Sequence, residues 1–261
     1  MNLGDAGPRE PWLGKRFGDL LHTDDPHYLK LWQRVAEPTF DYQALGEVDQ
    51  RRLQMLAYQI FPDQRDAFDG QDFLARLRCH PQMAAELGDL GKWLHETSDL
   101  EPRPMEGTQS HWPLQLHAAY KIREILAGVG WLRAGRRAPF QSGVLALHDE
   151  KIELLFVTLD KRVGYHAGIT YHDYAVSPAL FHWQSQNSAG PDTAGGRRYI
   201  ESLENGWRFQ LFVRPDKQAP YRALGKVSFR SHTGDRPISV LWDIETPIPQ
   251  AHFSQYSVLR A

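Results

Sequence analysis

The sequence is poor in cysteine and has no long apolar run. Cys79 is the only cysteine among 261 residues, which excludes an intrachain disulfide framework and a zinc site built from several cysteines. No stretch of about 18 apolar residues occurs, so we expect no membrane span. The N-terminus "MNLGDAGPREPWLG" lacks the basic and apolar regions of a signal peptide. We therefore expect a cytoplasmic protein, in keeping with a lone thiol in a reducing compartment.

The chain also lacks a large excess of charge of either sign. Its net charge of −2 argues against a strongly basic nucleic-acid binder. The charges are unevenly distributed, because residues 1–135 carry a net −5 and residues 136–261 a net +3. This asymmetry indicates two regions with different roles, or it arises by chance.

Motifs of a helicase motor and of a phospholipase-D-like nuclease are missing. The segments "LGKRFG" (13–18) and "LGKVSF" (224–229) contain Gly-Lys but lack the hydroxyl residue and glycine spacing of a phosphate-binding loop. His117 and Lys121 do not have the spacing of a His-x-Lys-x4-Asp motif. A metal-dependent nuclease built on Asp149, Glu153 and Asp160 remains a third alternative.

The histidines do not indicate a metal site. Four of them occur in one region, but their spacings match no metal-ligand motif: His148, His166, His172 and His182. We expect neither a metal centre nor a cofactor.

The first half of the chain has helical periodicity. Apolar residues recur at helical spacing in "DDPHYLKLWQRV", where Asp24 or Asp25 caps the helix and Pro26 begins it. Further helices are predicted in residues 47–61, 69–80, 81–96 and 114–130. Short amphipathic helices of this kind form small bundles, and the Pro- and Gly-containing segment 99–113 is typical of a connector.

After Arg133 the pattern changes to β-branched and aromatic runs separated by turn residues. We expect strands at 142–148, 152–159, 179–186, 198–203, 207–214, 221–232 and 236–245. The fold class is therefore α+β, with a small helical bundle followed by a mostly antiparallel β-barrel or pseudobarrel. The predicted domains are 1–113, and 114–261 with one leading helix.

The segment "YHDYAVSPALFHWQSQNS" (171–188) is rich in aromatic and uncharged polar residues. Because strand side chains alternate, His182, Gln184 and Gln186 should share one face, bordering a concave surface near Asp173. Such a row can pair with base edges, and the nearby rings of Tyr171, Tyr174 and Trp183 can stack on bases. The alternative is a polar network that braces a loop.

Two arginine pairs follow glycines, namely Arg136-Arg137 in "AGRRAPF" and Arg197-Arg198 in "GGRRYI". Arginine beside flexible backbone suits phosphate contacts. We expect Lys161 to add a further contact to the phosphates of the same DNA strand. The alternative is that these are solvated loop charges.

Several segments carry a resemblance to a known family. They are "LLFVTLDK" (154–161), "DYAVSPALFHWQSQNS" (173–188), "GRRYI" (196–200), "LFVR" (211–214) and "RPISVLWDI" (236–244). The region 114–250 resembles the bacterial domain of unknown function 3427, which closes the C-terminus of superfamily 2 helicases associated with DNA restriction and phage defence. The helical half is similar to the region preceding that domain.

The resemblance and the residues together predict a DNA-recognition module of a restriction or defence system. The module would read a sequence or a modified base and would have no motor of its own. The alternative is a protein-interaction module that docks a helicase or nuclease subunit. DNA is the expected partner, and no membrane partner is expected.

Overall fold

The computed structural model describes residues 16–61, 68–132, 143–159 and 173–257. The chain divides into two compact units. The first comprises residues 1–104 and 110–138, and the second comprises residues 105–109 and 139–261. Arg136, Arg137, Lys161 and Tyr171 lie outside the described residues.

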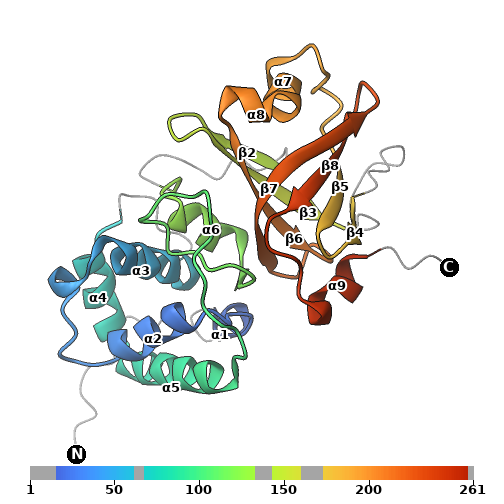
Figure 1. Cartoon of the computed structure of the whole chain (residues 1–261). Helices are drawn as coiled ribbons and strands as arrows, with labels where there is room; N and C mark the ends of the chain where they lie inside the picture. Colours follow the sequence, from blue (N-terminus) through green and yellow to red (C-terminus); the bar gives the residue numbers. More distant parts are fainter. Residues whose placement is uncertain (1–15, 62–67, 133–142, 160–172, 258–261) are drawn as a thin grey trace, which may run out of the picture. The chain divides into compact units, whose positions relative to one another are not determined.

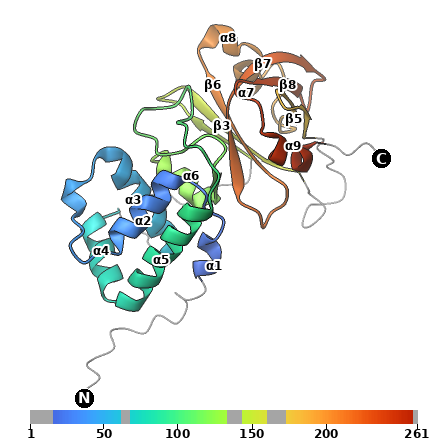
Figure 2. The ribbon, with the colours of Figure 1, turned by 60° about the horizontal axis from the view of Figure 1, so that its bottom comes forward.

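The first unit is helical, as predicted. Its elements are α1 (Arg16–Leu20), α2 (Pro26–Val35), the 3-10 helix η2 (Tyr42–Ala44), α3 (Glu47–Ile60), α4 (Gly70–Arg78), α5 (Pro81–Thr97), β1 (Ala119–Tyr120) and α6 (Ile122–Gly128). Asp25 caps α2 by accepting hydrogen bonds from the backbone N–H groups of His27 and Tyr28. Helix α2 packs against α5, and α3 packs against α6 (Figure 2).

A glycine allows the close approach of α2 and α5. A Cβ on Gly91 would lie 3.0 Å from the Cβ of Trp32 and 3.1 Å from the carbonyl oxygen of Leu29. Trp32 and Leu29 are fully buried at this contact. The bundle core therefore depends on a residue without a side chain at this position.

The second unit contains a mixed sheet flanked by short helices. Its elements are β2 (Val144–Leu147), β3 (Ile152–Thr158), β4 (Tyr174–Ser177), β5 (Leu180–Gln184), α7 (Ala194–Ile200), α8 (Ser202–Asn205), β6 (Arg208–Arg214), β7 (Tyr221–Thr233), β8 (Ser239–Ile244) and α9 (Gln250–Tyr256). Seven strands follow the order β2-β3-β6-β7-β8-β5-β4. Figure 1 shows them strongly twisted, with α7 and α8 at one end and α9 at the other.

The α+β class is confirmed, but the sheet is not closed among the described residues, so the predicted barrel is not supported. Strands β2 and β4 end the sheet and do not pair with each other among the described residues. The sheet is nevertheless curled, since Tyr199 contacts both Glu153 on β3 and Trp183 on β5. Three strands separate β3 from β5, which would place them about 19 Å apart in a flat sheet. The two strands therefore approach each other around the Tyr199 side chain.

Two features differ from a succession of antiparallel strands. Strands β3 and β6 pair in parallel, and the other strand pairs along this path are antiparallel. Residues 198–203, predicted as a strand, lie instead in α7 and α8. The Thr193 side chain caps α7 by accepting from the Gly196 N–H at 3.0 Å. A parallel pair needs a crossover connection, and these helices form part of it.

Candidate functional site

Tyr174 and His182 form an aromatic pair on the side of the sheet opposite its core. They are cross-strand partners on β4 and β5. Their rings stack with centroids 5.1 Å apart and planes 21° apart. Both side chains are half-buried. The pair therefore presents aromatic surface at the edge of the sheet.

Gln184 lies on the same face as His182. Its backbone N–H donates to Oδ1 of Asp173 at 2.8 Å, and its side-chain Nε2 donates to Oγ of Ser239 at 3.1 Å. The bond to Ser239 orients the side-chain amide. Gln186 does not continue the row, because β5 ends at Gln184. The prediction that all three polar residues share one strand face is wrong for Gln186.

The chain leaves the strand at Ser185, which is completely buried. Its hydroxyl accepts from the Ile238 N–H at 2.9 Å and donates to the Ala189 carbonyl at 3.0 Å. These bonds compete with continued strand pairing. A network that braces the loop after β5 is thus present at Ser185, immediately after the polar row.

Trp183 faces the core and is not positioned to stack on a base. It is 4% exposed and packs edge-on against Tyr199, with ring centroids 5.1 Å apart. Trp242 also contacts it. The alternation that places His182 and Gln184 outward necessarily places Trp183 inward.

The loop before α7 is held by an exposed ion pair. Nη2 of Arg236 contacts the two carboxylate oxygens of Asp192 at 2.7 and 2.8 Å. The hydrogen bond from Arg236 lowers the pKa of Asp192. The loop between β5 and α7 is therefore tied to the β7–β8 turn.

Arg197 and Arg198 belong to helix α7 rather than to the loop that the sequence predicted. Arg197 is exposed. Arg198 turns toward the sheet, where its Nε lies 2.9 Å from Oε2 of the fully buried Glu153. The contact is an ion pair without the alignment of a good hydrogen bond.

Glu153 has two partners inside the unit. Besides Arg198, the Tyr199 hydroxyl donates to its Oε1 at 2.8 Å. Burial raises the pKa of the Glu153 carboxyl, and the nearby guanidinium opposes that shift. Burial also raises the pKa of Tyr199 well above its ordinary value. From the sequence, Glu153 was a candidate carboxylate of a metal-dependent nuclease. Sequence reasoning missed its role as the partner of Arg198.

The two described carboxylates of the nuclease alternative, Asp149 and Glu153, do not form one site. Asp149 is exposed in the turn between β2 and β3, whereas Glu153 is buried beneath α7. Asp160, His166 and His172 lie outside the described residues. Within the described part of the chain, no three His, Cys, Asp or Glu side chains are grouped to hold a metal ion.

A second buried polar cluster, in the first unit, was also missed. The Tyr120 hydroxyl donates to Oδ2 of Asp25 at 2.6 Å, and Nε2 of His22 lies 2.7 Å from Oε2 of Glu124. Glu124 also accepts from the Lys121 N–H and so caps α6. The cap before α2 was readable from "DDPHY", but no local pattern joins it to Tyr120.

The second unit is thus a mixed α+β domain with an open, curled sheet and a buried glutamate paired with a partly exposed arginine. A model of the family described as Domain of unknown function (DUF3427) matches residues 114–256, which run from just before β1 to the end of α9. The chain belongs to this family. No curated protein matches the sequence. Within the described residues, no helix is long and apolar enough to cross a bilayer.

Proposed function

We propose that the second unit is a DNA-recognition module and that the row Tyr174, His182 and Gln184 contacts bases. The stacked Tyr174–His182 pair is the single observation that carries this proposal. As the family resemblance implies, the module serves a bacterial restriction or phage-defence system. It would act beside a superfamily 2 helicase or a nuclease subunit.

The chemistry of the row supports base contacts more than phosphate contacts. Its three members carry aromatic surface and hydrogen-bonding groups, but Tyr174 and Gln184 carry no charge. A base stacked on an aromatic side chain contributes about 1–3 kcal/mol to binding. An oriented glutamine amide can distinguish an adenine edge from other bases. Ser239 sets that orientation in the protein.

Two described cations on β7 already pair with carboxylates. Arg230 lies 2.8 Å from Asp243, and Lys226 lies 3.6 Å from Glu245. The sequence offers further cations for phosphate contacts in Arg136, Arg137 and Lys161, which lie outside the described residues. DNA binding that falls steeply with salt is expected if such cations meet the backbone.

Binding of the full chain to labelled DNA tests the proposal. Fluorescence anisotropy would be measured with duplex and single-stranded oligonucleotides over a series of salt concentrations. His182→Ala should weaken binding, because it removes half of the stack. Gln82→Ala, an exposed position on α5, is the control. Absence of DNA binding by the wild-type chain at low salt would contradict the proposal.

An interaction module is the second candidate, because two large apolar side chains of the second unit are exposed. Leu203 on α8 is 79% exposed, and Val176 on β4 is 45% exposed. Docking through such residues would be insensitive to salt, unlike binding to phosphates. Leu203→Ser should then abolish co-purification with a helicase or nuclease subunit while leaving DNA binding unchanged.

A further inference from the structure

The guanidinium of Arg198 is held by two contacts of different kinds. Its Nε lies 2.9 Å from the buried Glu153 carboxylate. Its central carbon lies 4.7 Å from the ring centroid of Trp207. The first contact occupies the Nε edge of the planar group, and the second places its central carbon over the indole ring. Together they restrict the rotamers that a surface arginine would otherwise sample.

Much of the group is left available for a ligand. A guanidinium has five N–H donors, and the Glu153 contact uses only the Nε side. Besides Glu153, Tyr199 and Trp207, no described residue is a partner of this guanidinium. The Arg198 side chain remains 21% exposed. An anion can therefore reach its remaining donors from solvent.

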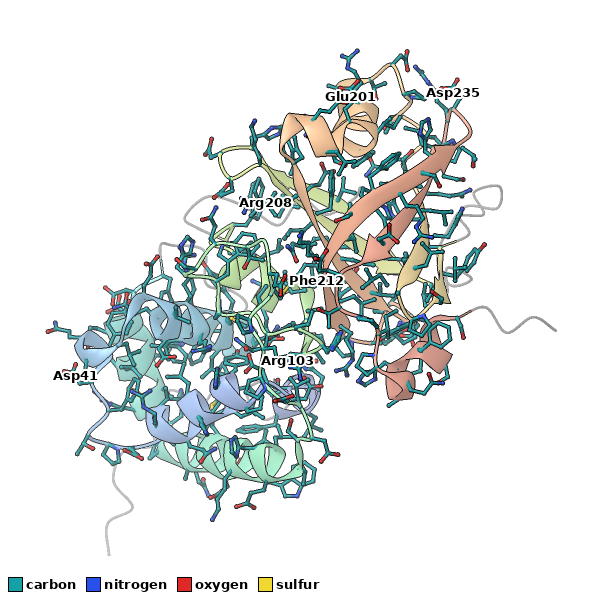
Figure 3. All side chains as sticks on the ribbon, viewed as in Figure 1. Asp41, Arg103, Glu201, Arg208, Phe212 and Asp235 are labelled. Atoms are coloured by element: carbon teal, nitrogen blue, oxygen red, sulfur yellow. The ribbon has the colours of Figure 1, made fainter. Side chains whose placement is uncertain are left out.

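A second nitrogen-bearing side chain contacts the same indole. The ring of His148, exposed in the turn after β2, meets Trp207 edge-on with centroids 5.4 Å apart. Arg208, beside Trp207 in sequence, donates instead to the carbonyl oxygen of Glu150. Figure 3 labels Arg208 and also Glu201, which lies between α7 and α8, in the part of the second unit that contains Arg198.

We propose that Arg198 is a pre-organised phosphate contact and that Glu153 is its positioning residue. The ligand is a backbone phosphodiester of a nucleic-acid strand, whose two unbridged oxygens match the fork of a guanidinium. This inference rests on the proposed function. Because Glu153 already balances the charge of Arg198, the site suits a singly charged phosphodiester better than doubly charged inorganic phosphate.

The test compares arginine-to-lysine substitutions in the full chain. Arg198→Lys keeps the charge but loses the fork, so we expect about tenfold weaker binding to a labelled oligonucleotide with a similar salt slope. Arg34→Lys is the matched control, because Arg34 also pairs with a carboxylate, Asp49, and lies over a ring, that of Phe40. It should bind like the wild type.

Glu153→Gln tests the positioning role with a variant of nearly the same size. We expect weaker DNA binding with an unchanged salt slope, because the cation remains and only its anchor is lost. Circular dichroism and the melting temperature would establish that each variant is folded. If a variant fails to fold, the ¹H–¹⁵N signal of Arg198 Nε in the wild-type chain provides the second measurement. That signal should move when the oligonucleotide is added.

The outcomes separate this inference from the proposed function. If the wild-type chain binds no DNA, the proposed function fails and this inference fails with it. If the wild type binds DNA but Arg198→Lys matches Arg34→Lys, only the inference fails. Titration with inorganic phosphate distinguishes the source of the anion. A shift of the Arg198 signal that phosphate causes and DNA does not would overturn the assignment to a strand.

Discussion

The hydroxyl of Tyr120 donates a 2.6 Å hydrogen bond to the carboxylate of Asp25, 95 residues earlier in the chain. Both residues are fully buried. Asp25 meanwhile accepts from two backbone N–H groups at the start of α2. One carboxylate therefore caps a helix and joins it to the segment before α6.

Replacing Tyr120 with phenylalanine should destabilise the first unit by about 1–3 kcal/mol, because a buried acceptor loses its donor. Urea denaturation followed by circular dichroism at 222 nm measures the change. Tyr42→Phe is the control, since Tyr42 lies half-buried in a short 3-10 helix and its hydroxyl makes no hydrogen bond to a described residue. Equal stabilities of the two variants would contradict this account.

The stability contributed by Glu153 should fall as pH rises. Burial raises the pKa of this carboxyl above its ordinary value of 4.5, so the native state binds its proton more tightly than the unfolded state does. Its contribution is complete below pH 4.5 and is lost as pH rises through the folded-state pKa. Glu153→Gln cannot lose a proton. Relative to the wild type, it should gain stability in urea denaturation as pH rises from 4.5 through the folded-state pKa of Glu153. A constant difference across that range would show that the pKa is not raised.

Gly196→Ala should destabilise the second unit by about 1–3 kcal/mol through overpacking. A Cβ at this position would lie 1.9 Å from the carbonyl oxygen of Gly190, so backbone must move. In Gly18→Ala the added Cβ meets no atom within 4 Å, and this exposed helical position should gain about 0.5–1 kcal/mol. The two melting temperatures should therefore shift in opposite directions.

Two variants, Gln184→Ala and Ser239→Ala, test whether the Gln184 amide contacts a base or only stabilises the sheet. Both remove the hydrogen bond between the side chains, but only the first removes the amide. If Gln184 reads a base, Gln184→Ala should weaken preferred DNA by about 1–3 kcal/mol and leave weak binding to random DNA. Ser239→Ala should weaken it less. If the amide only braces the sheet, both variants would lower the melting temperature alike and keep the DNA preference.

The helical half was predictable because its determinants are local. Asp25 and Pro26 start α2 by direct contact with the next residues, and apolar spacing then selects the buried face. The same reasoning placed His182 and Gln184 on one strand face, since strand alternation is also local. Local reasoning could not place Gln186. The regular strand ends before it because the buried Ser185 hydroxyl accepts a hydrogen bond from the N–H of Ile238, which lies in a distant segment.

By itself, the sequence determined the α+β class, the family and the outward face of β5, because short-range periodicity and motifs encode them. Only the tertiary structure decided that the sheet stays open and that "RRYI" is helical. Tyr199 and Ile200 favour a strand locally, but the contacts of Tyr199 with both β3 and β5 are made from a helix. Only tertiary structure also paired Arg198 with Glu153. A charge can enter the core only beside an opposite charge, and that partner comes from a strand folded against α7.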